Sequence, residues 1–285
     1  MKVVPRADLP GEQRDLLAAL GQYLHVIATL LPRVSEHVKE GPAATVLYML
    51  FVRTLQLSRA LQDLCIAGYA DESRLLGRAM VSAGLTALFI AENDCDSRAL
   101  LYAFQQRETR RKRGTALVRH GLMKQSVFDE DDAKQTQLED ETLAKHEAAG
   151  TRVAARLGDR PTWSGMTDRQ VAERLNKLHW YDLLYGPASD ITHVSIVSLE
   201  TELEALSSGN IHIGPRFTTP FIAVFNAGQV VSGVSRRLSD YFRLEAKDLI
   251  DGADANLKAA IDAFVDATRA EVKDRMRRLG FQSPD

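Results

Sequence analysis

Residues 42–92 read PAATVLYMLFVRTLQLSRALQDLCIAGYADESRLLGRAMVSAGLTALFIAE, and this stretch decides the fold. Its apolar residues recur every three to four positions on both sides of Gly68, which is the pattern of two amphipathic helices. Pro42 suits the first turn of a helix, Gly68 suits a helix end, and Asp71 can cap the helix that continues to Glu92. The short link between the two helices predicts an antiparallel hairpin at the centre of a bundle.

The same period recurs through the rest of the chain, and no long segment alternates apolar and polar residues as a strand does. We therefore expect an all-α fold, a bundle of about eight helices with no sheet, forming one domain over residues 1–285. The longest irregular stretch is expected at residues 158–165. The other helices are expected over residues 11–38 (kinked or split at Pro32), 97–119, 129–157, 167–178, 187–206, 220–242 and 256–279.

Composition and charge exclude several classes of protein. The 285 residues are 45% hydrophobic and carry a formal net charge of -2, so no global attraction to nucleic acid or to an anionic membrane is predicted. Cys65 and Cys95 lack the spacing of a metal or redox pair. The first residues lack the apolar run of a secretory signal, and residues 79–91 are too short to cross a bilayer. We expect a cytoplasmic protein with no membrane partner.

Two charged blocks follow each other in the middle of the chain. Residues 107–124 are rich in arginine and lysine, and residues 129–141 are rich in aspartate and glutamate. The basic block could contact phosphates. We favour a solvated helical hairpin, because the adjoining acidic block screens the basic one and because aromatic residues for base stacking are missing there.

Two further segments carry a resemblance to a known family. Residues 75–81 read LLGRAMV and residues 185–195 read YGPASDITHVS, the latter preceded by Trp163 and by Trp180-Tyr181. Together they resemble the bacterial family called domain of unknown function 5677, over about residues 45–216. The helices of residues 219–279 are then expected to pack on that core.

The resemblance implies a set of site residues. The family pattern has an arginine on an early apolar helix, matched by Arg78, and a tyrosine, a serine and a histidine four residues apart, matched by Tyr185, Ser189 and His193. Ser82 departs from the pattern, which has a glutamate one turn after the arginine. Residues four apart on a helix share a face, so Ser189 and His193 are expected to point the same way.

A second resemblance suggests a chemistry. Residues 188–193 are similar to the nucleotide-binding helical domains of prokaryotes and higher eukaryotes, several of which cut RNA with an arginine and a histidine on one helix; here Ala188 stands at the arginine's place. Arg78 could supply the guanidinium from another helix, with His193 as general acid or base, Ser189 beside it, and Tyr185 and Asp190 as substrate contacts. This mechanism needs neither a metal nor a cofactor.

Each of these residues also has a purely structural interpretation. Arg78 on an apolar helix needs a partner, for which Asp63, Glu92 and Asp190 are candidates. Tyr185 can be a packing residue, and His193 can be an ordinary helix residue. Two hypotheses therefore stay open: a metal-independent ribonuclease or nucleotide-related protein acting on RNA, and a non-catalytic helical scaffold that binds a partner protein. No histidine pattern predicts a metal site.

Overall fold

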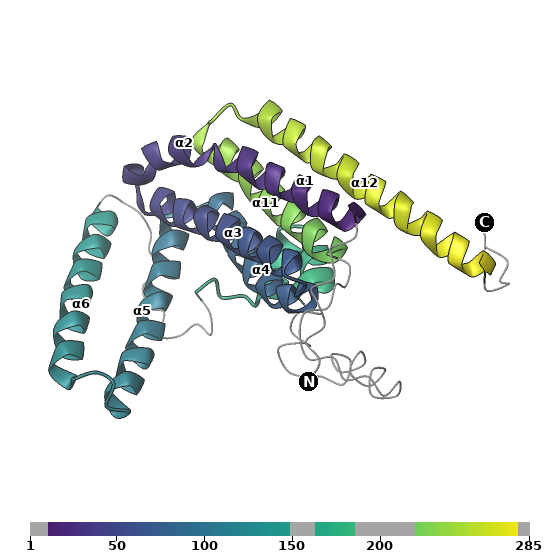
Figure 1. The fold of residues 1–285 in the computed structure, drawn as a ribbon. Helices are drawn as coiled ribbons and strands as arrows, with labels where there is room; N and C mark the ends of the chain where they lie inside the picture. Colours follow the sequence, from purple (N-terminus) through teal and green to yellow (C-terminus); the bar gives the residue numbers. More distant parts are fainter. Residues whose placement is uncertain (1–10, 149–162, 186–219, 279–285) are drawn as a thin grey trace.

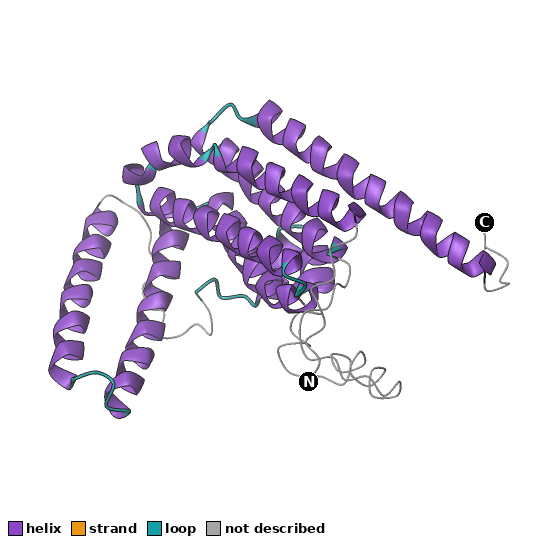
Figure 2. Cartoon of the chain, in the orientation of Figure 1, coloured by secondary structure: helices purple, strands orange, loops and turns teal. Residues whose placement is uncertain are grey.

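The computed structural model describes residues 11–148, 163–185 and 220–278, and these are almost entirely helical (Figure 2). No strand occurs in the described ranges. The expected all-α bundle is thereby confirmed. The helix expected over residues 187–206 lies outside the described residues.

The N-terminal helical segment is split where the proline predicted a break. Helix α1 spans Gly11–Ala28 and α2 spans Leu31–Glu36, followed by the 3-10 turn η1, Val38–Glu40. Pro32 lies in the first turn of α2, where its missing N–H leaves no helical hydrogen bond unmade. The apolar face of α1 is buried.

The central hairpin has the predicted form. Helix α3 spans Pro42–Ile66 with the proline in its first turn, and α4 spans Ala70–Glu92. Between them Gly68 takes a φ of 87°, a left-handed conformation that glycine adopts without steric cost. The predicted cap was wrong: the N-cap position is occupied by Tyr69, so Asp71 lies within the helix.

Helices α5, Cys95–Arg119, and α6, Gln125–Ala148, form a second hairpin that projects from the rest of the molecule (Figure 1). Helix α6 begins four residues before the expected start and packs mainly against α5. Arg111 pairs with Asp132 across the hairpin at 3.2 Å. The basic and acidic blocks thus face each other in part, as a paired hairpin predicts.

Short elements follow in residues 163–185. Thr167 and Gln170 form the predicted capping box at the start of α7, Asp168–Arg174, in which each side chain binds the other residue's backbone N–H. The helix ends earlier than expected, and Asn176 beyond it takes a left-handed φ of 54°. Helix α8, Leu178–Trp180, then continues into η3, the single π-helical turn Tyr181–Tyr185.

The C-terminal helices return to the N-terminal half of the chain. Helix α11, Phe221–Phe242, packs against α3 and α4, and α12, Lys247–Arg278, lies along α1 (Figure 1). Helix α12 starts nine residues before the expected position, which is a correction. Its first turns are held because Ile250 is buried and because Asp251 and Asp254 bind Arg236 of α11, contacts that sequence periodicity does not reveal.

Helix α4 lies in the core of the bundle. It packs against α3, α5 and α11, and most of its apolar side chains are buried. Two described segments, residues 11–40 and 75–92, are long and apolar enough to cross a membrane by length and composition alone. Core helices of soluble proteins have the same property, and the packing of α4 against three helices accounts for its apolar composition.

Candidate functional site

The structure brings together two of the five residues that the sequence singled out. Arg78 on α4 donates a hydrogen bond from Nη2 to the hydroxyl of Tyr185 at 3.1 Å, and its guanidinium carbon lies 4.7 Å from the centre of the tyrosine ring. Both side chains are partly buried. Ser189, Asp190 and His193 lie outside the described residues, so their approach to Arg78 stays a prediction.

The position of Tyr185 depends on the tryptophan that precedes it. Trp180 is 1% exposed and lies between α4 and α11, where two glycines leave room for the indole. A Cβ at Gly233 would stand 2.8 Å from Cη2 of Trp180, and one at Gly84 would stand 3.4 Å from its Cζ3. The ring of Tyr181 then stacks on that of Tyr185 at 4.8 Å between centroids. Side-chain packing thus holds the π-helical turn on α4.

Asp168 brings a carboxylate to this cluster. It is the first residue of α7, and its Oδ2 lies 3.5 Å from the hydroxyl of Ser82 on α4. Burial raises the pKa of the Tyr185 phenol and the negative charge of Asp168 raises it further, whereas the hydrogen bond from Arg78 lowers it. Asp168 therefore supplies negative charge beside Ser82, the position at which the family pattern has a glutamate.

A groove of about 680 Å³ opens beside Asp168 and Ser82. Its walls come from α3, α4, α5 and the segment before α7, and its volume lies in the range of small-molecule sites. The groove and the Arg78 cluster share part of α4, because Ala79 and Ser82 line the groove, although Arg78 and Tyr185 do not. The other lining residues are Leu50, Arg53, Leu57, Ala83, Thr86, Tyr102, Gln105, Arg113, Trp163, Ser164, Met166 and Asp168.

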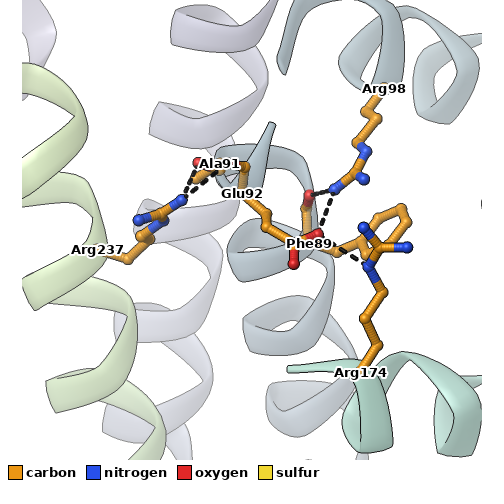
Figure 3. A network of polar contacts seen from close by, with 6 residues as sticks. All are labelled: Phe89, Ala91, Glu92, Arg98, Arg174 and Arg237. Carbon is orange, nitrogen blue, oxygen red and sulfur yellow. Dashed lines mark hydrogen bonds and ion pairs between the residues drawn. The ribbon is translucent and has the colours of Figure 1, made fainter. Parts of the chain in front are cut away.

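A separate network of hydrogen bonds and ion pairs lies at the C-terminal end of α4 (Figure 3). Glu92 accepts hydrogen bonds at 3.0 Å from Nη1 of Arg98 and from Nε of Arg174. Arg237 of α11 donates to the carbonyl oxygens of Ala91 and Glu92, at 2.5 and 3.1 Å. The last carbonyls of a helix have no partner within the helix, so these bonds satisfy groups that would otherwise be unpaired.

The same network sets the ionisation of Glu92. Burial alone would raise the pKa of this carboxyl, but the hydrogen bonds and charges of Arg98 and Arg174 outweigh that effect and lower it. The guanidinium of Arg98 also lies 3.8 Å from the ring centre of Phe89. We interpret the network as structural, because it joins four helices and one carboxylate oxygen, Oε2 of Glu92, binds two arginines.

The described contacts exclude two of the three candidate partners of Arg78. Glu92 binds Arg98 and Arg174 rather than Arg78, and Asp63 pairs with Arg59 one turn away. The third candidate, Asp190, lies outside the described residues, and among the described residues Arg78 binds the hydroxyl of Tyr185. Sequence reasoning also missed Asp168 as a site residue. The only sequence signal for Asp168 was the capping box of Thr167 and Gln170. That motif places Asp168 at the start of a helix but does not predict which residues it faces.

In the described ranges, no three histidine, cysteine, aspartate or glutamate side chains lie close enough together to hold a metal ion.

The comparisons with known proteins give one family. Residues 44–211, more than half of the chain, match the model of a family of unknown function, DUF5677. No curated protein and no solved structure matches the chain significantly. The match covers the core expected from the resemblance and includes Arg78 and Tyr185, so the chain belongs to the DUF5677 family.

Proposed function

We propose that the protein is a metal-independent ribonuclease, with Arg78 as the phosphate contact and His193 as the general acid and base. The observation that carries the proposal is the contact between Arg78 and Tyr185. Three residues separate Tyr185 from Ser189 and seven separate it from His193. Arg78 thus contacts Tyr185, the first residue of the motif that continues with Ser189 and His193.

The chemistry uses only groups of this chain. The imidazole of His193 takes the proton from a ribose 2'-hydroxyl, and the 2'-oxygen forms a bond to phosphorus. The bond from phosphorus to the 5'-oxygen breaks, and that oxygen receives a proton from the imidazolium. The guanidinium of Arg78 stabilises the negative charge that develops on the phosphoryl oxygens. Ser189 stands beside His193 in the motif, and Tyr185 and Asp190 orient the substrate.

Incubation with total RNA in the presence of a chelator tests the proposal. The wild-type protein should cleave the RNA, and the His193→Ala and Arg78→Gln variants should lose most of that activity. His120→Ala is the matched control, because His120 is an exposed histidine at the end of α5. Equal cleavage by all variants, or no cleavage by the wild type, would exclude the ribonuclease.

The biological setting that we propose is a bacterial stress response or phage defence, which is where an RNA-cutting helical domain would act on the cell's own or invading transcripts. Bacteria that express the wild-type chain should give fewer phage plaques than bacteria that express His193→Ala. Equal plaque numbers with several unrelated phages would exclude the role in phage defence, but would not exclude the ribonuclease activity.

A second candidate function is a scaffold that binds a partner protein. The observation that favours it is the projecting hairpin of α5 and α6, whose end exposes three large apolar side chains: Leu117, Leu122 and Val127. Exposed apolar groups at the end of a projecting element are typical of contact surfaces. If no RNA is cleaved, Leu122→Glu should abolish binding to any partner co-purified with the wild type, and Leu249→Glu, at an exposed leucine in α12, should not.

A further inference from the structure

We propose that the groove beside Asp168 binds one nucleotide unit, with its phosphate held by Arg53 and Arg113. This inference deepens the proposed function, because it names the substrate class of the same site. It can also be tested without any cleavage.

The two arginines enter the groove from different helices. Arg53 belongs to α3 and Arg113 to α5, and both line the cavity. Both are exposed, and within the described ranges neither forms an ion pair. A guanidinium offers a planar set of N–H donors that matches a phosphate group in charge and in geometry. Two such groups at one cavity favour an anionic ligand.

Part of the lining is aromatic, because Tyr102 and Trp163 belong to it. Trp163 meets Tyr102 edge to face at 5.3 Å between ring centres, and it meets Phe89 in the same way at 5.5 Å. The backbone N–H of Trp163 donates to Oε1 of Gln105 at 3.3 Å, which fixes the tryptophan at the groove. A half-buried aromatic wall offers stacking or edge contacts to a planar ring, which is how proteins hold nucleobases without reading their sequence.

Asp168 connects the groove to the residues of the proposed reaction. Its carboxylate lies 3.5 Å from the hydroxyl of Ser82, which lines the groove. The same carboxylate raises the pKa of Tyr185, whose hydroxyl binds Arg78. A phosphate-bearing ligand in the groove therefore has a second guanidinium site next to it along α4. This arrangement suits a strand with one nucleotide in the groove and the following phosphate at Arg78.

The ligand can be a free nucleoside monophosphate or a nucleotide within an RNA strand, and two probes distinguish these sources. Adenosine monophosphate and a fluorescein-labelled RNA hexanucleotide are titrated separately into the purified full chain. The variants are Arg53→Gln, Arg113→Gln and Trp163→Leu. Arg119→Gln is the matched control, because it removes the same charge from an exposed arginine of α5 that does not line the groove.

We expect the wild type and Arg119→Gln to bind equally. Each arginine variant should bind about tenfold more weakly through loss of a charge-assisted hydrogen bond, and Trp163→Leu should bind about tenfold more weakly through loss of base stacking. Binding of the monophosphate alone identifies a free nucleotide, and tighter binding of the hexamer identifies RNA. No binding by the wild type, or equal binding by all variants, overturns the proposal. Circular dichroism melting of each variant separates lost binding from lost folding.

The outcomes for the groove and for the ribonuclease are independent. Binding that depends on Arg53 and Arg113 without cleavage of RNA supports the groove and excludes the ribonuclease. Cleavage that depends on His193 but is unaffected by Arg53→Gln and by Arg113→Gln supports the ribonuclease and excludes the groove as its nucleotide site.

Discussion

Trp180 lies directly on the bare backbone of Gly233, so that a Cβ at position 233 would stand 2.8 Å from its Cη2 atom. Gly233→Ala should therefore force the buried indole to move and should lower the free energy of unfolding by about 1–3 kcal/mol. Urea unfolding measures this. Gly252→Ala is the control: nothing lies within 4 Å of a Cβ there, and alanine in that helix should stabilise by about 0.5–1 kcal/mol. Equal effects of the two substitutions would show that the indole is free to shift.

The contact between Arg78 and Tyr185 should be measurable as a coupling energy. Arg78→Ala should lower the free energy of unfolding by more than the ~0.5 kcal/mol typical of a surface change, because the guanidinium is partly buried and bonded. A double-mutant cycle with Tyr185→Phe and Tyr185→Leu should give about 0.5–1.5 kcal/mol of coupling, from the hydrogen bond and the ring contact. Additive effects would show that the two side chains do not interact.

The ion pairs of Glu92 should make stability depend on pH in the acid range. The pKa of Glu92 is lower in the folded protein than its ordinary value of 4.5, so its contribution is present above that value and is lost as the pH falls through the folded pKa. Glu92→Gln should cost about 1–2 kcal/mol at pH 7, and the difference from wild type should shrink below about pH 4.5.

Asp63→Asn provides the control for Glu92. Asp63 and Arg59 are each 61% exposed, so water screens their ion pair and its removal should change stability by less than about 0.5 kcal/mol at any pH. A pH-independent difference between the wild type and Glu92→Gln would contradict the assignment of the lowered pKa.

Limited digestion with subtilisin, a protease of broad specificity, tests whether the chain is one domain. Cleavage should be fastest in the irregular stretch expected over residues 158–165. The fragments should stay together on size-exclusion chromatography, because α11 packs on α3 and α4 and α12 packs on α1. Elution as two separately folded fragments would show two domains instead.

The helices could be predicted because their signals are local. Pro42 and Gly68 bracket α3, Thr167 and Gln170 start α7, and the break at Pro32 follows from the chemistry of a single residue. The start of α12 was missed because its first turns depend on side chains of α11, and propensity alone does not include such contacts.

The site was predictable only in part, because its residues meet across long stretches of chain. The contact of Arg78 with Tyr185 joins positions 107 residues apart; the family resemblance singled out both residues but did not predict their contact. Nothing in the sequence matched Arg237 to the end of α4, 145 residues away from its Glu92 partner. Likewise Arg53 and Arg113 share a groove only because α3 and α5 pack together.

The hairpin of α5 and α6 should open at a lower free-energy cost than the rest of the molecule. Helix α6 packs mainly against α5, with Phe128 lying over Gly114, whereas α4 is enclosed by three helices. A segment with few buried contacts opens without unfolding the remainder. In native-state hydrogen–deuterium exchange, the amides of α6 should therefore exchange through an opening far less costly than global unfolding, while those of α4 should exchange only when the whole bundle unfolds.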